Sequence, residues 1–378
     1  EELCKVNDNV IVVLSCGAPV LVKKWRKDVK AILNLYIGGQ ATGEAAYDLL
    51  YGNVNPSGKL AETFPRKNSD NIVSKYFPMG PRTCEYRESI YVGYRYFDKA
   101  NKPVRYPFGY GLSYTKFEYS NLQLSSTAIN EGTNLSVSFT IKNVGEVAGA
   151  EIAQLYVSDV ESTIFRPVKE LKGFKKVYLE AGEEKTVTLT LDSRAFAYYN
   201  VNINDWHIES GDFEILVGAS SQDIKLKATV NVTSAKPEVQ VPDYRESAPY
   251  YYDLKGDEIP VEQFEAIYGD KMPDNSKYQK GELTACNSVS QCAVSPFGKF
   301  LSGAATLGAK LISLSAENPE MITESVKDMP LRAATAMTGG LVDMVNGRKG
   351  GFRKFIKGFK KENRNALLDE NGNIIKEQ

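Results

Sequence analysis

The stretch Leu-Ser-Val-Ser-Phe-Thr-Ile at residues 135–141 alternates apolar and polar side chains, and this pattern decides the fold of the middle of the chain. Because successive side chains of a strand point to opposite faces, it predicts a strand with one buried face. Comparable runs begin at Ile152, Thr186 and Phe213, with turn residues between them. Short alternating strands at such intervals predict an all-β, immunoglobulin-like sandwich, which we place at residues 116–235.

The segment before this sandwich follows a different pattern. Residues 9–15 form a continuous β-branched apolar run, typical of a strand covered on both faces, and a second run covers 31–37. We expect a short helix at 20–28 between these runs and another at 42–51 after them. Strand, helix, strand and helix in this order predict a parallel βαβα unit. Since only two parallel strands are visible, residues 1–115 are predicted to form a partial parallel α/β sandwich.

The C-terminal segment, residues 236–378, opens with a polar linker that contains several prolines. Low periodicity from 270 to 300 predicts disorder or an extended wrap, and 341–361 is predicted to be helical. Phenylalanines at helical spacing among lysines make residues 351–361 a basic amphipathic helix. Such a helix can dock on a membrane surface or a partner, but most amphipathic helices bury their apolar stripe in protein, and we favour that interpretation. The segment is therefore predicted to be a partly disordered helical tail.

The composition excludes several function classes. Lys and Arg number 46 against 47 Asp and Glu, and this balance argues against a dedicated nucleic-acid binder. One histidine and no paired CxxC motif argue against the common zinc sites, so we expect no metal and no cofactor. Five scattered cysteines favour free thiols in a reducing compartment. Since the chain begins at Glu1 with no signal-peptide pattern, we expect a fragment whose true N-terminus is missing, and the free thiols favour a cytoplasmic location.

Several long motifs occur in the order found in one enzyme family. They include GGQATGEAAYDLLYGNVNPSGKLAETFP at 38–65, YRESIYVGYRYFD at 86–98, VRYPFGYGLSYTKFEYS at 104–120 and IKNVGEVAGAEIAQLYVS at 141–158. Over about residues 5–232 the chain resembles glycoside hydrolase family 3, the β-glucosidase and β-xylosidase group. The resemblance implies that the β-sandwich is a fibronectin type III-like domain, and the tail looks like an extension carried by some members.

The resemblance also implies an activity and a missing partner. Family members hydrolyse β-glycosides with retention, which requires two carboxylates close to the glycosidic bond. In the family a (β/α)8 barrel comes first, and both carboxylates would fall before Glu1. We therefore expect a C-terminal fragment of a β-glucosidase-like retaining glycosidase that acts on a β-linked glucoside or related oligosaccharide. It would contain no catalytic residue, be inactive alone, and depend on the N-terminal barrel domain of the same protein.

Three polar residues are candidate contacts to the sugar. Gln40 and Glu44 follow the second predicted strand, and ligands of α/β sheets bind at the carboxyl ends of strands. Glu88 matches a glutamate in the family motif. These residues could line the outer rim of a sugar subsite. The alternative, which we favour, is that Glu44 caps its helix or faces solvent and that Glu88 is a structural hydrogen-bond acceptor.

Other interpretations remain open. Arg95 and Asp98 are predicted to pack domains rather than clamp a substrate. His207 lies near Ser210 and Asp212, but neighbours on one strand alternate faces and would not converge as a triad. The fibronectin-like domain could instead be a non-catalytic carbohydrate-binding module or a scaffold. In that case the tail would serve as an oligomerisation arm, and a homo-oligomer is possible.

Overall fold

A computed structural model of the chain describes residues 1–77, 80, 82–256, 258–316, 318–358, 369 and 372–375. The chain forms two compact units, each described here by itself. Unit 1 comprises residues 1–77 and 85–272, and unit 2 comprises residues 78–84 and 273–378. The short segment 78–84 therefore belongs with the C-terminal residues rather than with its neighbours in sequence.

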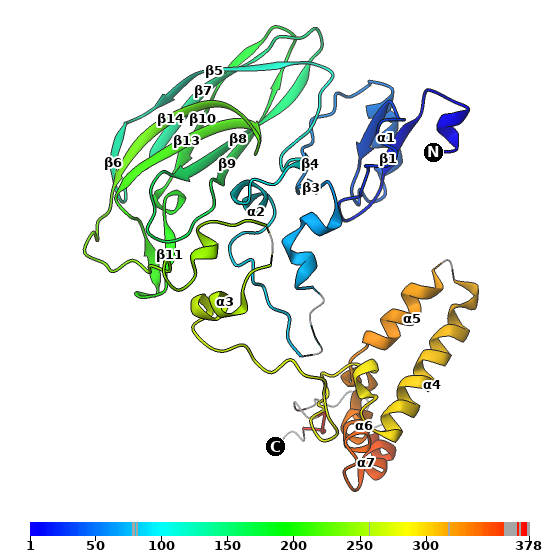
Figure 1. Ribbon diagram of the computed structural model, residues 1–378. Coiled ribbons are helices and arrows are strands. Elements are labelled where there is room, and N and C mark those ends of the chain that lie inside the picture. Colours follow the sequence, from blue (N-terminus) through cyan, green and yellow to red (C-terminus); the bar gives the residue numbers. More distant parts are fainter. Residues whose placement is uncertain are drawn as a thin grey trace. The chain divides into compact units, whose positions relative to one another are not determined.

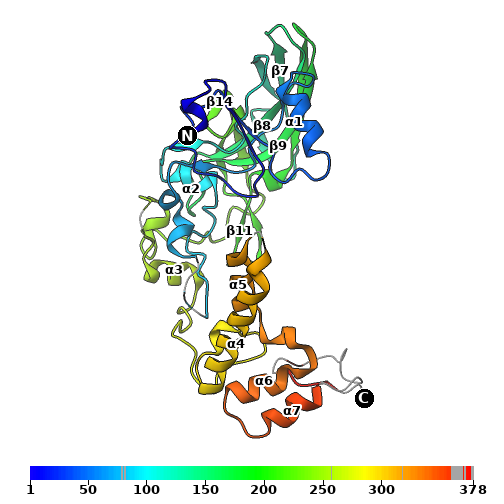
Figure 2. The same ribbon diagram turned by 90° about the vertical axis from the view of Figure 1, so that its right-hand side faces the viewer.

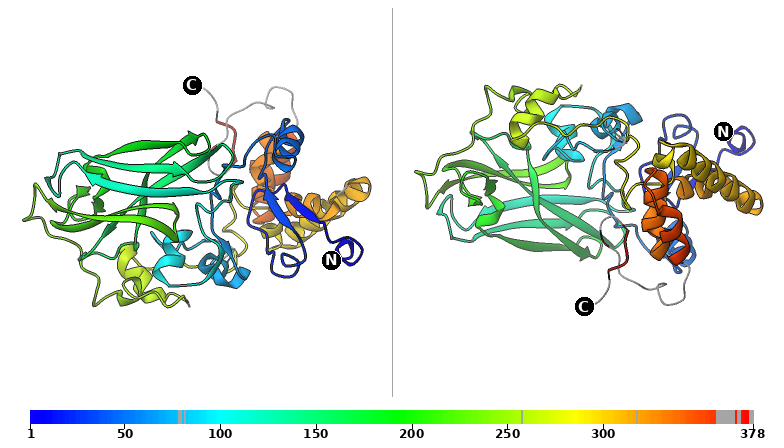
Figure 3. Two further views of the ribbon diagram at one scale, coloured as in Figure 1. Left: turned by 90° about the horizontal axis from the view of Figure 1, so that it is seen from above. Right: turned by 90° about the horizontal axis from the view of Figure 1, so that it is seen from below.

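The centre of unit 1 is a β-sandwich of two facing sheets (Figures 1 and 3). One sheet has the order β10 (Glu184–Leu191), β7 (Leu135–Asn143) and β5 (Phe117–Leu124). The other has the order β6 (Ala128–Asn130), β14 (Asp223–Thr233), β13 (Gly211–Ser220), β8 (Gly149–Asp159) and β9 (Glu170–Leu179).

The alternation read from the sequence explains the core of this sandwich. Leu135, Val137, Phe139 and Ile141 are fully buried on one face of β7, while the residues between them are only half-buried. They pack against the inner face of the opposite sheet, which includes Phe213 of β13. The predicted strands that begin at Ile152, Thr186 and Phe213 correspond to β8, β10 and β13, so the predicted sandwich is confirmed.

The N-terminal part of unit 1 contains two parallel strands and one helix. β1 (Ile11–Leu14) pairs with β2 (Ala31–Asn34) in parallel, and α1 (Thr42–Leu50) follows, as predicted. The helix predicted at 20–28 is wrong, because the structure has only turns there. Val22 is the one buried side chain of that segment, and a short helix without packing is not stable in water. The strand predicted to be covered on both faces is partly open in this chain, where Ile11 and Val13 are 46% and 42% exposed.

Several short elements connect these parts. The strands are β3 (Phe64–Pro65), β4 (Val104–Tyr106), β11 (Tyr198–Asn200) and β12 (Asp205–His207), and the helices are α2 (Tyr94–Lys99) and α3 (Val261–Tyr268). Single 3-10 turns cover Leu3–Lys5, Asn68–Asp70, Ile72–Lys75, Ser193–Ala195 and Pro249–Tyr251. A second core of unit 1 joins Ile72, Tyr91 and Phe97 to Tyr251 and Ile259. The predicted linker after the sandwich is thus partly built into unit 1.

Unit 2 is helical (Figure 2). Its helices are α4 (Pro296–Ile312), α5 (Pro319–Asp328), α6 (Thr338–Val345) and α7 (Gly351–Gly358), and 3-10 turns cover Ser290–Cys292, Ser313–Ser315 and Leu331–Met337. Residues 273–289 contain no helix or strand among those described, which agrees with the low periodicity there. α6 and α7 lie within the segment predicted to be helical, and residues 359–361 lie outside the described residues. No helix was predicted at α4, although Ser295 caps it and Pro296 is its first residue.

Candidate functional site

Two of the three predicted sugar contacts lie together at the start of α1. Gln40 precedes the helix and Glu44 is in its first turn, and both side chains are exposed. Neither side chain forms a hydrogen bond to another described residue. A carboxylate in the first turn of a helix interacts favourably with the helix dipole, so the position of Glu44 has a structural explanation as well. The two residues are accessible to a ligand, and their role in sugar binding stays a prediction.

Glu88 lies in a different environment from Gln40 and Glu44. Its side chain is buried in unit 1, and no donor among the described residues reaches its Oε2 atom. Burial raises the pKa of this carboxyl above its ordinary value, and the residue's own backbone N–H lowers it in part. Since Glu88 is buried and Glu44 is exposed, the structure does not present them as a pair at one open site.

A buried ion pair lies immediately before Glu88. Arg87 Nε is 2.6 Å from Glu85 Oε2, and both side chains are about nine-tenths buried. The same guanidinium donates a hydrogen bond to the carbonyl oxygen of Ile259 at 3.1 Å and lies over the ring of Tyr76. The sequence did not indicate that this pair is buried, because an acidic and a basic residue two positions apart in a loop are ordinarily solvated.

Tyrosines fix the backbone around this ion pair. The Tyr251 hydroxyl donates to the carbonyl oxygen of Arg87 at 2.7 Å, and the Tyr91 hydroxyl donates to the carbonyl oxygen of Tyr251. The backbone N–H of Ile259 donates to the Tyr76 hydroxyl. Tyr76, Arg87 and Tyr91 are therefore bonded to Tyr251 and Ile259, although more than 150 positions separate the two groups in sequence.

The predicted packing role of Arg95 and Asp98 agrees with the structure. Asp98 of α2 forms an ion pair with Lys169 at 2.7 Å, and Arg95 forms one with Glu170 at 3.4 Å. Both pairs attach α2 to the start of β9 in the sandwich. His207 is buried on β12 with its ring edge-on to Tyr198.

A cleft of about 670 Å³ opens between the loop after α1 and the sandwich. Its lining residues are Gly52, Asn53, Val54, Asn55, Ser57, Tyr114, Val147, Ala148, Gly149, Ala150, Lys176 and Tyr178. The rings of Tyr114 and Tyr178 are more than half exposed. None of the three predicted sugar contacts is among these lining residues, although most of the lining residues lie within the motifs at 38–65, 104–120 and 141–158.

Hydrogen bonds of Asn55 and Tyr114 fix the segments that line this cleft. Asn55 donates to the carbonyl oxygen of Ala148 at 3.0 Å and accepts from the hydroxyl of Ser113 and the backbone N–H of Tyr114. A side chain at Gly149 would collide with the Asn55 amide at 2.5 Å. The Tyr114 hydroxyl donates to the carbonyl oxygen of Leu49 at 2.6 Å. A volume of this size with two aromatic rings and a few polar groups is typical of small-ligand sites.

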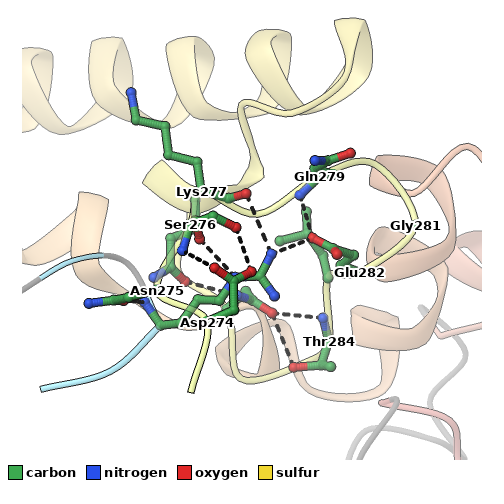
Figure 4. Close-up of polar contacts among 12 residues, drawn as sticks. Asp274, Asn275, Ser276, Lys277, Gln279, Gly281, Glu282 and Thr284 are labelled. Carbon is green, nitrogen blue, oxygen red and sulfur yellow. Dashed lines mark hydrogen bonds and ion pairs between the residues drawn. The ribbon is translucent and has the colours of Figure 1, made fainter. Parts of the chain in front are cut away.

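In unit 2, residues 274–284 form a network of polar contacts (Figure 4), to which Arg82 contributes. Arg82 Nη2 lies 2.6 Å from Glu282 Oε2, and Arg82 Nε donates to the carbonyl oxygen of Ser276 at 2.8 Å. The side chain of Asn275 accepts from the backbone N–H groups of Arg82 and Thr83, both at 3.1 Å. Residues 82–83 are thus fixed to the 275–282 loop by main-chain and side-chain bonds alike.

The basic helix predicted at 351–361 corresponds to α7 over its described part. Phe355 is half-buried and its backbone lies against Gly340 of α6, whereas Phe352 is exposed. Lys354 forms an ion pair with Asp343 of α6 at 2.7 Å. One face of α7 therefore packs on protein, as we favoured, and another remains accessible.

Three further features of the described residues concern the cysteines, the hydrophobicity of the helices and the possible metal ligands. All five cysteines are free thiols, and burial raises the pKa of Cys292 to about 11. No helix in the described part of the chain combines the length and apolar character needed to cross a bilayer. Among the described residues there is also no cluster of three or more His, Cys, Asp or Glu side chains arranged to hold a metal ion.

Comparison with protein families identifies two domains. Residues 1–114 match the glycosyl hydrolase family 3 C-terminal domain, and residues 151–221 match the fibronectin type III-like domain. The first match includes Gln40, Glu44 and Glu88, and the second lies within the sandwich. Unit 2, apart from the segment 78–84, lies beyond both matches.

Individual relatives agree with these matches. The chain is 54% identical over 234 residues to thermostable beta-glucosidase B of Acetivibrio thermocellus, covering 62% of this chain and 31% of that protein. It is 44% identical over 230 residues to an exo-alpha-(1->6)-L-arabinopyranosidase of Bifidobacterium breve, covering 61% of this chain and 30% of that protein. Among solved structures, a GH3 beta-glucosidase of Bifidobacterium adolescentis is similar with a TM-score of 0.60 and 38% identity, covering 67% of this chain and 37% of that one. The chain therefore spans about 30% of the length of these curated relatives.

Proposed function

We propose that this chain, which carries the C-terminal domain of glycosyl hydrolase family 3 followed by a fibronectin type III-like domain, is the C-terminal part of a retaining β-glucosidase. The complete protein would hydrolyse the O-glycosyl bond of a β-linked glucoside. The observation that carries this proposal is the 54% identity to a beta-glucosidase over 234 residues, which are 62% of this chain. The matched residues make up only 31% of that relative, so the activity proposed here is that of a longer protein.

The proposed reaction requires two carboxylates at one site. Retaining hydrolysis uses a nucleophilic carboxylate and an acid/base carboxylate about 5 Å apart on either side of the glycosidic bond. Glu44 is exposed on α1, whereas Glu88 is buried and no donor among the described residues reaches its Oε2 atom. We propose that both catalytic carboxylates belong to the part of the protein that precedes residue 1, and that Gln40 and Glu44 line the outer rim of the sugar site.

An exposed apolar strand supports the need for this further part. β1 is an apolar strand with a single sheet neighbour, and Ile11 and Val13 leave nearly half of their surface open. Parallel sheets are normally covered on both faces, because their strands are apolar throughout. The N-terminal part of the complete protein would cover this surface. An apolar-surface dye should therefore bind this chain, and adding the barrel half in trans should abolish the binding.

The decisive test is hydrolysis of aryl β-glucoside, β-xyloside and α-L-arabinopyranoside. The substrates are offered to this chain and to a polypeptide extended at its N-terminus to the length of the relatives. We expect turnover only by the extended polypeptide, with the aryl β-glucoside preferred. Turnover by this chain alone would contradict the proposed location of both carboxylates. In that case Glu44→Gln and Glu88→Gln would be the first variants to measure.

The cleft beside Tyr114 and Tyr178 favours a second function, non-catalytic carbohydrate binding. Exposed aromatic rings next to amide and hydroxyl groups suit the apolar face and the hydroxyls of a sugar. Binding of cello-oligosaccharides, measured by calorimetry, should weaken at least tenfold in Tyr178→Ala. It should be unchanged in Tyr199→Ala, which removes an exposed strand tyrosine outside the cleft. No binding by the parent chain, or equal binding by both variants, would rule this function out.

A further inference from the structure

The outward face of α4 in unit 2 is an uninterrupted apolar stripe. Phe300, Leu307 and Leu311 lie along it, and Leu314 continues it beyond the helix end; these four residues are 60% to 78% exposed. The opposite face of α4 carries buried Ala309 and packs against α5 and α6. An amphipathic helix ordinarily turns its apolar face to the core, so two apolar faces on one helix call for a second packing partner.

The spacing of the stripe is that of a helix–helix seam. With Ala304 included, its members are Phe300, Ala304, Leu307, Leu311 and Leu314, so the intervals are four, three, four and three residues. This alternation averages 3.5 residues, the period of side chains that interlock between two supercoiled helices. The stripe itself contains no charged residue. A seam this narrow fits another helix, whereas a bilayer surface favours a broader apolar face rimmed with basic residues.

We propose that the α4 stripe binds the α4 stripe of a second copy of this chain, in antiparallel orientation, to form a homodimer. A twofold axis would pass beside Leu307, so that Leu307 meets its own copy. Phe300 of one helix would then lie opposite Leu314 of the other. Leu311 would lie opposite Gly303, where an added Cβ would have no neighbour within 4 Å. Leu307 and Phe300 would therefore form large apolar pairs across the seam, while Gly303 leaves room for Leu311.

Charge and area both fit a second copy. In the antiparallel pair, Lys299 near the start of one helix approaches the last carbonyl groups of the other, which favours a cation. Each of the four large apolar side chains of the stripe offers roughly 120 Å², so together they bury roughly 500 Å² per copy. The total of roughly 1,000 Å² is at the lower limit for a specific interface. The dimer is thus expected to dissociate on dilution.

The first test measures mass in solution. Sedimentation velocity of the full chain over a hundredfold concentration range should show a monomer–dimer equilibrium. Leu307→Lys places two like charges on the twofold axis and should shift the dissociation constant at least tenfold toward monomer. Leu112→Lys is the matched control, since Leu112 is an equally exposed leucine in unit 1, and it should behave like the parent chain. Circular dichroism of each variant confirms that it is folded.

The second test measures orientation by disulfide formation in mild oxidant. Leu307→Cys should cross-link to its own copy, because residue 307 lies at the axis. Ile312→Cys should not cross-link, since the two copies of residue 312 would be about 15 Å apart along the helices. A parent chain that stays monomeric at all concentrations would overturn the proposal, as would equal cross-linking by both variants. Binding of the parent chain to anionic phosphatidylglycerol vesicles that Leu307→Lys abolishes would instead identify a bilayer as the occupant.

Discussion

Arg82 and Arg87 lie five positions apart in one loop, yet they belong to different units of the protein. Each guanidinium lies 2.6 Å from a glutamate oxygen, that of Glu282 for Arg82 and that of Glu85 for Arg87. The side chains of the Arg87 pair are 10% and 8% exposed, whereas those of the Arg82 pair are 22% and 43% exposed. The two ion-pair distances are equal, but removing one partner costs more free energy in the buried Arg87 pair than in the exposed Arg82 pair. The reason is that the remaining buried charge is not solvated by water.

The largest effect is expected for Arg87→Ala. It leaves the buried Glu85 carboxylate without a counter-charge and removes the bond to Ile259, so the free energy of unfolding of unit 1 should fall by about 3–5 kcal/mol. Urea unfolding followed by tryptophan fluorescence reports on this, since Trp25 and Trp206 both lie in unit 1. The double variant Arg87→Met with Glu85→Leu should recover much of the loss. A loss no larger than that in Arg82→Ala would break the comparison.

Tyr251→Phe tests the hydrogen bonds around the buried pair. The substitution removes the hydroxyl that donates to the Arg87 carbonyl oxygen and leaves that acceptor buried, at a cost of about 1–3 kcal/mol. The same urea titration measures it. Tyr244→Phe is the control, because it alters a tyrosine packed on the same core whose hydroxyl donates to no described acceptor. Equal losses in both variants would show that packing, rather than this hydrogen bond, holds the segment.

Glu88→Gln should produce a smaller change of opposite sign. Burial raises the pKa of Glu88 in the folded chain, so the folded state binds a proton more readily than the unfolded state. The contribution of Glu88 to stability is therefore full below its ordinary pKa and is lost as the pH rises through the folded-state value. At pH 7 the glutamine variant should be more stable than the parent chain, and at pH 4 the difference should nearly vanish. A gain that is equal at both pH values would reject this account.

Arg82→Ala should have the smallest effect of the four. Its partner Glu282 is accessible to water, and Asn275 still holds the backbone of residues 82–83. We expect slightly faster hydrogen exchange at the amides of residues 279–284 and no change in unit 1. Salt at 0.5 M should reduce the difference, because mobile ions screen exposed pairs. An effect on the unfolding of unit 1 would show that the two arginines are not independent.

Elements with a local sequence pattern could be predicted, whereas the burial of the two arginines could not. The sandwich strands were predictable because each carries its own period of two, as Leu135 to Ile141 illustrate, and α1 begins and ends at local signals. The helix expected at 20–28 failed because only Val22 of that segment finds a place in a core. α4 was missed because its many small residues hide its period.

The candidate site shows the same division. Gln40 and Glu44 were predictable as neighbours because they flank one helix start. The burial of Glu88 was not, since it depends on packing between distant segments, and Tyr76 and Tyr251, which both interact electrostatically with Glu88, are far apart in sequence. The cleft lined by Tyr114 and Tyr178 is likewise assembled from two segments that have no shared sequence pattern.

By itself, then, the sequence determined the order of the domains, the strands of the sandwich and the family motifs, because these depend on the period and identity of neighbouring residues. Only the tertiary structure decided that residues 78–84 belong with the C-terminal helices, that Arg87 is buried, and which face of α4 is open. The physical reason is that burial is a property of contacts between segments distant in sequence. A local pattern fixes which side chains share a face, but the packing of other segments decides whether that face is covered.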